Sequence, residues 1–261
     1  MFELITTFYN EQNIDRRNEF LQALKLNAEN TKIHKVYILC ESGEEFIRSF
    51  SPKIEIVKCE NRPKFKDLIL FANTLSTNVI KIIANTDIYF NETLSKALHV
   101  KEKEVYCLTR WNQIDAGQIE FFLNFKSQDS WIFKGILPDN IGAYFMGVPG
   151  CDNRLAAELV VNGFKISNPS LSVHSIHLHA TEKRTYHKVL DRVSGEYAYC
   201  LPKYLARDTL NVTPKKLYFL VRRKYYNALF TKTLEGVEIS LFDRFKSFFY
   251  LNYYKLRLKL I

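Results

Sequence analysis

Residues 79–90 read VIKIIANTDIYF, and this stretch decides the fold. Its first half, residues 79–84, is a β-branched apolar run, which is typical of a strand buried inside a sheet. Its second half turns polar at Asn85, Thr86 and Asp87, so the strand is predicted to end in a loop that carries a carboxylate. We therefore expect a central strand with a candidate functional group at its carboxyl end.

Strand and helix patterns alternate on the amino-terminal side of this stretch. Strands are predicted at residues 2–8, 35–40 and 54–59, and helices at residues 13–30 and 64–75. Together with residues 79–84 they form a β-α-β-β-α-β succession, which predicts an α/β fold with a mixed, mostly parallel sheet flanked by helices. In such sheets ligands bind at the carboxyl ends of the strands, where loops bring polar groups together.

The charge of the chain is uneven. Apolar residues make up 47% of the 261 residues and aromatic residues 14%, which is enough for a core and argues against disorder. The net charge of +9 falls within residues 202–261, which hold 13 Lys or Arg against four Asp or Glu. We therefore expect an α/β domain at residues 1–201, followed by a basic, aromatic, helical extension at residues 202–261.

The sequence also argues against several classes of protein. No uncharged apolar run reaches 18 residues, so no membrane-spanning helix is expected, and the first residues predict a strand rather than a signal peptide. The five cysteines are scattered and form no CxxC pair. Neither a zinc site nor a disulfide framework is therefore expected, and a reducing compartment is the default.

Asp87 has two interpretations from the residues alone. A hard divalent cation takes one or two carboxylates plus phosphate oxygens, so an acid at the end of a central strand could hold Mg²⁺ or Mn²⁺ against a diphosphate. Alternatively, Asp87 or Asn91 caps the helix that is predicted around residues 93–98.

Asp152 follows a forced turn. Gly147, Pro149 and Gly150 predict the turn, and residues 155–162 continue as a helix. A carboxylate at that position is either a simple helix cap or a general base aimed from a rigid helix end at an acceptor hydroxyl.

Histidines are concentrated at residues 174–179, which read HSIHLH. In an extended segment His177 and His179 point to one face and His174 to the other. Two imidazoles on one face suit a metal or phosphate site, and a polar strand facing solvent is the alternative. Arg184 follows and adds a donor suited to a diphosphate.

The segments NTDIYFNETL at residues 85–94, GVPGCDNRLAAEL at 147–159 and HLHATEKRTY at 177–186 together resemble GT-A glycosyltransferases, the nucleotide-diphospho-sugar transferases. The resemblance runs from about residue 2 to about residue 201. It is most specific to small bacterial enzymes of polysaccharide synthesis, and its most specific blocks are PGCDNR and HLHxxxxR.

The resemblance implies a role for each candidate residue. Asp152 would be the base of an inverting hexosyl or deoxyhexosyl transfer, with Asp129 as the rival base or an acceptor-binding residue. Asp87, with His177 or His179, would hold Mn²⁺ or Mg²⁺. The donor, a nucleotide-diphosphate sugar, would be bound by Thr6, Phe8, Asn10, Arg62, Asn85, Thr86 and Arg184. Trp111, Trp131 and Asn153 would contact the acceptor, although the tryptophans are equally explained as core residues.

Two other functions remain open at this stage. Asn85 stands where a first metal-binding acid is expected, and this departure favours a catalytically degenerate scaffold or glycan-binding protein. A sugar-phosphate nucleotidyltransferase is the second alternative, but such enzymes normally begin with a glycine-rich phosphate loop, and TTFYNEQNIDRR at residues 6–17 contains no glycine.

The extension mixes Lys and Arg with Phe and Tyr, a pattern typical of a helix that lies in a lipid interface. Its apolar stripe is predicted at Leu241, Phe245, Phe248 and Asn252. The alternatives are packing on the domain or on a second subunit. Nucleic acid ranks lower because no recognised binding module is present. We therefore expect a cytoplasmic protein at the inner face of the membrane, acting on a glycan or lipid-linked glycan of the O-antigen, capsule or lipopolysaccharide type.

Overall fold

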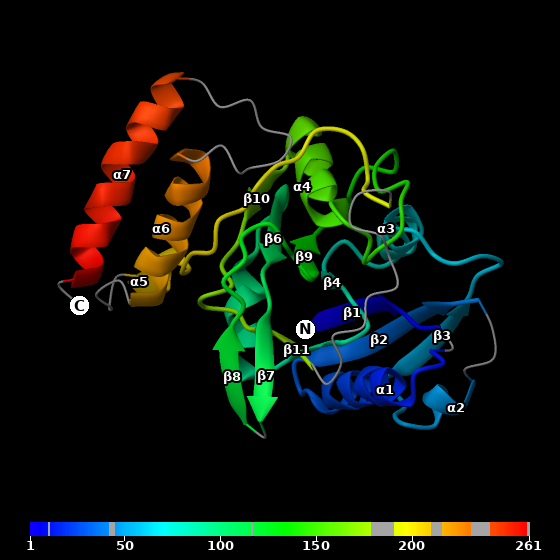
Figure 1. Ribbon diagram of the computed structural model, residues 1–261. Coiled ribbons are helices and arrows are strands. Elements are labelled where there is room, and N and C mark those ends of the chain that lie inside the picture. Colours follow the sequence, from blue (N-terminus) through cyan, green and yellow to red (C-terminus); the bar gives the residue numbers. More distant parts are fainter. Residues whose placement is uncertain are drawn as a thin grey trace.

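The fold is built around strand β4 (Ile80–Ala84), which is buried at every position, as the sequence predicts. The computed structural model describes residues 1–9, 11–41, 45–115, 117–178, 191–209, 216–230 and 241–259. Seven strands form the main sheet in the order β10-β6-β9-β4-β1-β2-β3 (Figure 1). The other six strands are β1 (Phe2–Thr7), β2 (Ile33–Cys40), β3 (Ile54–Lys58), β6 (Glu104–Leu108), β9 (Ser130–Lys134) and β10 (Lys165–Ser167).

Strand β9 is antiparallel to both of its neighbours, whereas the remaining strands of this sheet run parallel. The predicted mixed, mostly parallel sheet is therefore confirmed. Because β9 runs the other way, its first residue, Ser130, lies opposite Ala84 and Leu108, the last residues of β4 and β6. Asp129 therefore lies at the same sheet edge as the polar loop that follows β4.

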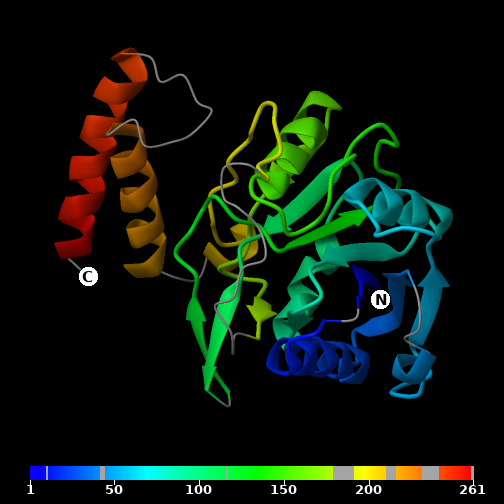
Figure 2. The ribbon, with the colours of Figure 1, turned by 45° about the vertical axis from the view of Figure 1, so that its right-hand side comes forward.

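Helices cover both faces of the sheet, because alternate strand residues point to opposite sides. Leu4 and Ile82 belong to the core cluster that includes Phe20 and Leu24 of helix α1, whereas Ile5 and Ile83 belong to the cluster of α3 and α4. The helices are α1 (Ile14–Glu29), α2 (Glu45–Arg48), α3 (Phe65–Thr74), a 3-10 helix η1 (Glu92–His99), α4 (Cys151–Val161), α5 (Ala206–Thr209), α6 (Lys216–Phe230) and α7 (Leu241–Lys259). Figures 1 and 2 show α1 on one side and α3 and α4 on the other.

A second, four-stranded sheet brings the histidine segment to the end of β4. Its order is β5-β11-β7-β8, with β5 (Ile88–Phe90), β7 (Trp111–Asp115), β8 (Gln118–Phe121) and β11 (Ser175–His177). The pairing of β11 with β5 sets His177 opposite Ile88, and the Leu178 amide donates to the Asp87 carbonyl at 3.1 Å.

The predicted helical extension consists of α6 and α7. In the described part of the chain, no helix is long and apolar enough to cross a membrane. The stripe predicted to lie in a lipid interface is only partly described. Phe248 and Asn252 are exposed, and the buried positions are Ser247 and Leu251, while the side chains of Leu241 and Phe245 lie outside the described part.

Candidate functional site

Asp87 and His177 meet at the carboxyl end of β4. The His177 Nε2 atom lies 3.1 Å from Asp87 Oδ2, although the two residues are 90 positions apart in the sequence. Both side chains are buried. Asp87 does not cap the following helix, because Asn91 takes that role by accepting the Thr93 amide. The helix-cap interpretation therefore holds for Asn91 and not for Asp87. His177 is buried and is not on a solvent-facing strand.

The surroundings of Asp87 favour its charged form. Burial alone would raise its pKa, but the His177 imidazole and the guanidinium groups of Arg16 and Arg110 outweigh that effect and hold the pKa of Asp87 below its usual value. The carboxylate is therefore negative at neutral pH. It lies in a place where water contributes little screening.

Asp129 is anchored beside the same loop. Asn85 Nδ2 donates to Asp129 Oδ1 at 3.0 Å, and the Asn85 amide donates to the Asp129 carbonyl at 3.0 Å. Arg110 Nη1 lies 3.4 Å from Asp129 Oδ1. Asn85 stands where a metal-binding acid was expected, and its side-chain amide orients the Asp129 carboxylate.

Arg110 is the residue of this site that the sequence analysis missed. It also donates from Nε to Asn112 Oδ1 at 3.0 Å and lies over the Phe122 ring at 4.4 Å, so its position is fixed. Its charge acts on Asp87, Asp129 and Asp152 alike. Its position just after strand β6 could have indicated it. Ligands bind at the carboxyl ends of the strands in such sheets, and this rule applies to Arg110 after β6 as it does to Asp87 after β4.

Asp152 comes to the site from the first turn of α4. Gly150, not Asp152, is the N-cap residue, with φ of +80°. The Asp152 carboxylate instead reaches back to the main sheet, where Oδ2 accepts the Gln128 amide at 3.4 Å and Oδ1 contacts the Cys151 thiol at 3.2 Å. The interpretation as a simple helix cap is therefore excluded.

The pKa of Asp152 is raised to about 8. Burial is the largest cause, and the neighbouring Asp129 carboxylate adds repulsion; the bonds from Cys151 and Gln128 and the charge of Arg110 offset only part of this. A carboxyl group with a pKa near neutral pH can accept or release a proton under working conditions, which makes it suited to acid-base catalysis.

This pKa can be measured directly. We expect Asp129→Asn to lower the pKa of Asp152, because the substitution removes the like charge beside it. The measurement is a pH titration of ¹³C-labelled aspartate carboxyl groups by NMR, with the Asp152 signal assigned by its absence in Asp152→Asn. Asp139→Asn, at an exposed position, is the control and should leave the value unchanged. An Asp152 pKa near 4 in the wild-type protein would contradict the prediction.

The residues present fit a divalent cation in part. Three buried acceptor oxygens, Asn85 Oδ1, Asp87 Oδ1 and Asp129 Oδ2, have no hydrogen-bond partner among the described residues. Oxygen ligands of this kind suit Mg²⁺ or Mn²⁺, and an imidazole lies beside them. No group of three or more His, Cys, Asp or Glu side chains placed to hold a metal occurs in the described ranges. Asp87 and His177 therefore offer two protein ligands, and a bound diphosphate would have to supply others.

Three predicted residues, Asn10, His179 and Arg184, lie outside the described residues.

Two of the predicted threonines hold neighbouring strand ends together through hydrogen bonds to main-chain carbonyl groups. Thr6 donates to the Ala84 carbonyl at 2.9 Å, and Thr86 donates to the Thr7 carbonyl at 2.8 Å. Arg62 is exposed and lies over the Phe145 ring at 4.7 Å.

Three predicted ligand contacts are corrected by the structure. The Phe8 side chain is in the core against Phe20, so it cannot contact a donor. Trp131 is 1% exposed and packs edge-on against Phe65, so it is a core residue and not a sugar-stacking surface. The Asn153 amide is buried and donates to Gln128 and to the Ala198 carbonyl, both at 3.3 Å, so it holds the structure together rather than binding an acceptor.

Trp111 is half-buried. Its Nε1 donates to the Ser170 carbonyl at 2.8 Å, and its ring packs on Phe121 and on His174. It therefore supports strand β7 beside the site.

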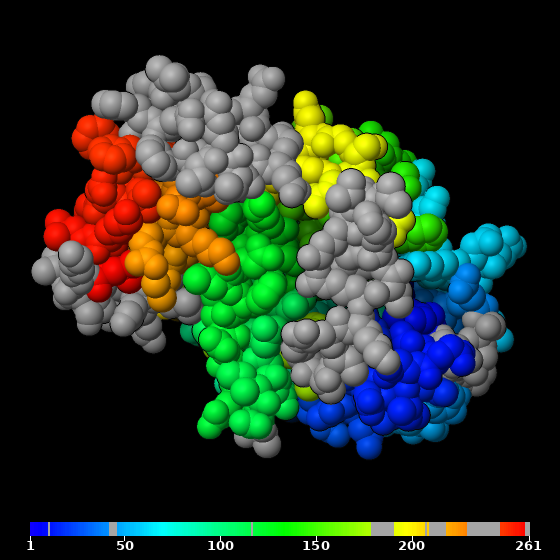
Figure 3. Space-filling view, viewed as in Figure 1, coloured from blue at the N-terminus to red at the C-terminus, as the bar shows by residue number. Residues whose placement is uncertain are grey.

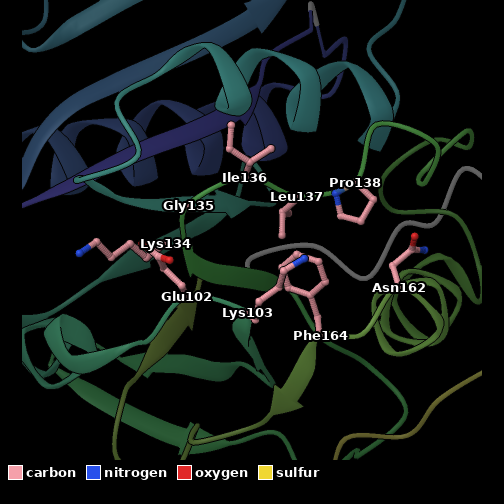
Figure 4. Close-up of a pocket in the computed structure, with 9 residues that line it drawn as sticks. All are labelled: Glu102, Lys103, Lys134, Gly135, Ile136, Leu137, Pro138, Asn162 and Phe164. Carbon is pink, nitrogen blue, oxygen red and sulfur yellow. The ribbon is translucent and has the colours of Figure 1, made fainter.

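A cavity of about 470 Å³ lies elsewhere (Figure 4). It is lined by Glu102, Lys103, Lys134, Gly135, Ile136, Leu137, Pro138, Asn162 and Phe164. These residues surround the start of β6 and the end of β9, which is the edge of the sheet opposite to Asp87 and Asp129. The cavity is therefore separate from the candidate site.

No protein-family model matches the sequence, and no curated protein matches it. Solved structures with a similar arrangement do exist. Mannosyltransferase PcManGT from Pyrobaculum calidifontis, solved with GDP-Man and Mn²⁺, is 14% identical with a TM-score of 0.46 over 98% of this chain and 69% of that one. GalNAc-T7, solved with UDP, GalNAc and Mn²⁺, is 9% identical with a TM-score of 0.47 over 99% and 56%.

A third similar structure is 4-diphosphocytidyl-2C-methyl-D-erythritolsynthase from Anaerococcus prevotii, which is 10% identical with a TM-score of 0.40 over 64% of this chain and 86% of that one. At TM-scores below 0.5 these likenesses carry no argument about chemistry, for which only the chain's own residues count.

Proposed function

We propose that this chain is a glycosyltransferase that moves a sugar from a nucleotide-diphosphate donor to a hydroxyl group. The observation that carries the proposal is the convergence of Asp87, Asp129, Asp152 and His177 at one edge of the sheet. One buried oxygen each of Asp87 and Asp129 has no hydrogen-bond partner in the described part of the chain. The pKa of Asp152 is raised and that of Asp87 is lowered. Such a pair is expected where one carboxyl group accepts a proton and the other binds positive charge.

Asp87 and His177 form the donor side of the proposed site. They would hold Mn²⁺ or Mg²⁺, and such an ion, when bound, neutralises negative charge on a departing nucleoside diphosphate. Arg110 is fixed close to both and adds a permanent positive charge. Leaving-group stabilisation matters because glycosyl transfer passes through a state that resembles an oxocarbenium ion.

Asp152 forms the acceptor side. As the base, it takes the proton of the acceptor hydroxyl while that oxygen attacks the anomeric carbon. The single displacement inverts the configuration, and the nucleoside diphosphate departs with the bonding electrons. Asp129 is the weaker candidate because its carboxylate is paired with the permanent charge of Arg110, whereas the raised pKa of Asp152 suits a group that takes up a proton. We assign Asp129 to positioning and to raising the pKa of Asp152.

The finer description belongs to the same proposal. The transferred group would be a hexose or deoxyhexose, and the acceptor a growing surface glycan of the O-antigen, capsule or lipopolysaccharide type, either free or lipid-linked. The cytoplasmic face of the membrane is the proposed location. The net charge of +9, which resides in residues 202–261, supports it.

Binding of nucleoside diphosphates tests the proposal. UDP, GDP, CDP, ADP and dTDP are each added with Mn²⁺, Mg²⁺ or EDTA, and thermal unfolding is followed. We expect one nucleotide, only with metal, to raise the Tm by roughly 5–10 °C at 100 times its Kd. The matching nucleotide sugar should then release that diphosphate slowly.

Other outcomes separate the alternatives. Stabilisation by no nucleotide under any metal condition would favour a degenerate scaffold. Stabilisation by a nucleoside triphosphate, with pyrophosphate released on addition of a sugar phosphate, would show a nucleotidyltransferase. Binding that is equally strong in EDTA would retain the donor site but remove the metal from the proposal.

A further inference from the structure

Helix α7 is attached to the molecule through α6. Tyr226 of α6 stacks on Tyr250 at 4.9 Å and on Tyr254 at 5.6 Å, and Ser247 and Leu251 of α7 are buried. Helix α6 in turn packs on the body, where Val221 lies in a cluster with Phe121 and Leu171. Figures 1 and 2 both show α6 between α7 and the sheets, so one side of α7 faces outward.

That outward side carries a stripe of large apolar groups. Phe249, Tyr253 and Leu256 are 59%, 48% and 58% exposed. Their spacing of four and three residues places them on one helical face, opposite the side that carries Ser247, Leu251 and Tyr254. In Figure 3 the described atoms of α7 form the outer edge of the molecule.

Basic residues border this stripe on both sides. Lys246 lies along one edge and Lys255 along the other, and the chain has no Asp or Glu after Asp243. The Arg257 guanidinium instead lies over the Phe219 ring of α6 at 5.6 Å. A second copy of α7 docked on the stripe would bring these like charges together, which disfavours self-association. The face is instead complementary to an anionic lipid interface. Such an interface attracts basic residues and buries aromatic and aliphatic side chains at shallow depth.

We propose that the outer face of α7, defined by Phe249, Tyr253 and Leu256 with Lys246 and Lys255, binds an anionic lipid bilayer with the helix in the plane of the interface. The proposal rests on exposure and charge in the extension alone and does not depend on the reaction proposed for the site. We assign a bilayer as the partner because the face carries both apolar side chains, which need an apolar environment, and basic side chains, which need negative charge.

Flotation with lipid vesicles tests this proposal on the full chain. Vesicles of phosphatidylcholine alone are compared with vesicles that also contain phosphatidylglycerol. We expect binding only to the anionic vesicles, and weaker binding at higher ionic strength. The triple variant Phe249→Ser, Tyr253→Ser, Leu256→Ser should lose it. The control Leu98→Ser, Val161→Ser, which changes exposed apolar residues on the body, should keep it.

A second variant guards against misfolding of the first. Replacing Lys246 and Lys255 by serine leaves the apolar stripe intact and should weaken vesicle binding about 25-fold, since each basic residue near an anionic surface contributes roughly fivefold. Equal binding to neutral and anionic vesicles, or unchanged binding by both variants, would overturn the proposal. So would a dimer in sedimentation that the triple variant dissociates, with no vesicle binding by the wild type.

Discussion

Replacing Asp152 by asparagine should lower the rate of sugar transfer by about 10²- to 10⁴-fold, the usual contribution of a general base. Asparagine keeps the size of the side chain and an oxygen that can accept the Gln128 amide, but it cannot take a proton. Donor affinity should therefore stay within about twofold, because the loss falls on the chemical step. Single-turnover transfer and nucleotide titration measure the two quantities separately.

The same substitution should stabilise the fold at neutral pH. The Asp152 carboxyl group binds its proton more tightly in the folded chain, with a pKa raised from 3.8 to about 8, than in the unfolded one. Its ionisation therefore favours unfolding as the pH rises from about 4 to about 8, and asparagine removes that effect. The Tm should rise at pH 8 and stay unchanged below pH 4.

Two controls make the assignment of the base decisive. Asp139→Asn alters an exposed carboxylate and should change neither turnover nor Tm. Asp129→Asn should reduce turnover less than Asp152→Asn and shift its pH dependence to lower pH. If Asp129→Asn alone abolishes turnover while nucleotide binding survives, Asp129 is the base and our assignment of Asp152 is wrong.

Asp87→Asn should weaken nucleoside diphosphate binding about 100-fold when Mn²⁺ is present and far less when EDTA is present. Disturbing groups that orient metal ligands already costs about 10- to 100-fold in metal affinity, so removal of a ligand charge belongs at the upper end. Asparagine is chosen because it retains an oxygen near His177, whereas alanine would leave buried polar groups unpaired. Isothermal titration calorimetry with and without metal gives both affinities.

The metal role of Asp87 has its own matched comparison. His177→Gln removes the second candidate ligand from the same pair and should give the same metal-dependent loss. Asp139→Asn should bind as the wild type does. An Asp87→Asn protein that binds nucleotide as tightly as the wild type in Mn²⁺ would exclude Asp87 from the metal site, whatever the result with Asp152.

The central strand and the site acids were predictable because each follows a simple local signal. The β-branched run before Asn85 marks β4, and the turn at Gly150 marks the start of α4. Asp87 and Asp152 stand directly after those signals. His177 was found by its histidine neighbours, although only the pairing of β5 with β11 shows which carboxylate it meets.

The errors arose where packing, rather than periodicity, decides. Residues 131–133 read WIF and are all apolar, so nothing in them reveals that Trp131 faces Phe65. On α7, stacking on Tyr226 selects which side turns inward, which the spacing of apolar residues alone does not show. Arg110 was missed because only Arg62 and Arg184 were considered as basic residues of the site, and the position after strand β6 was not.

The place of β11 in the chain has a consequence for how the protein is made. Among the described residues, the last strand of the main sheet ends at Ser167, and the segment that carries His177 is synthesised later. A growing chain therefore completes its scaffold before it has both members of the Asp87–His177 pair. Bringing together two residues that are 90 positions apart costs loop-closure entropy. A ligand that bound both residues would offset part of that cost, and it could do so only once both residues have been synthesised.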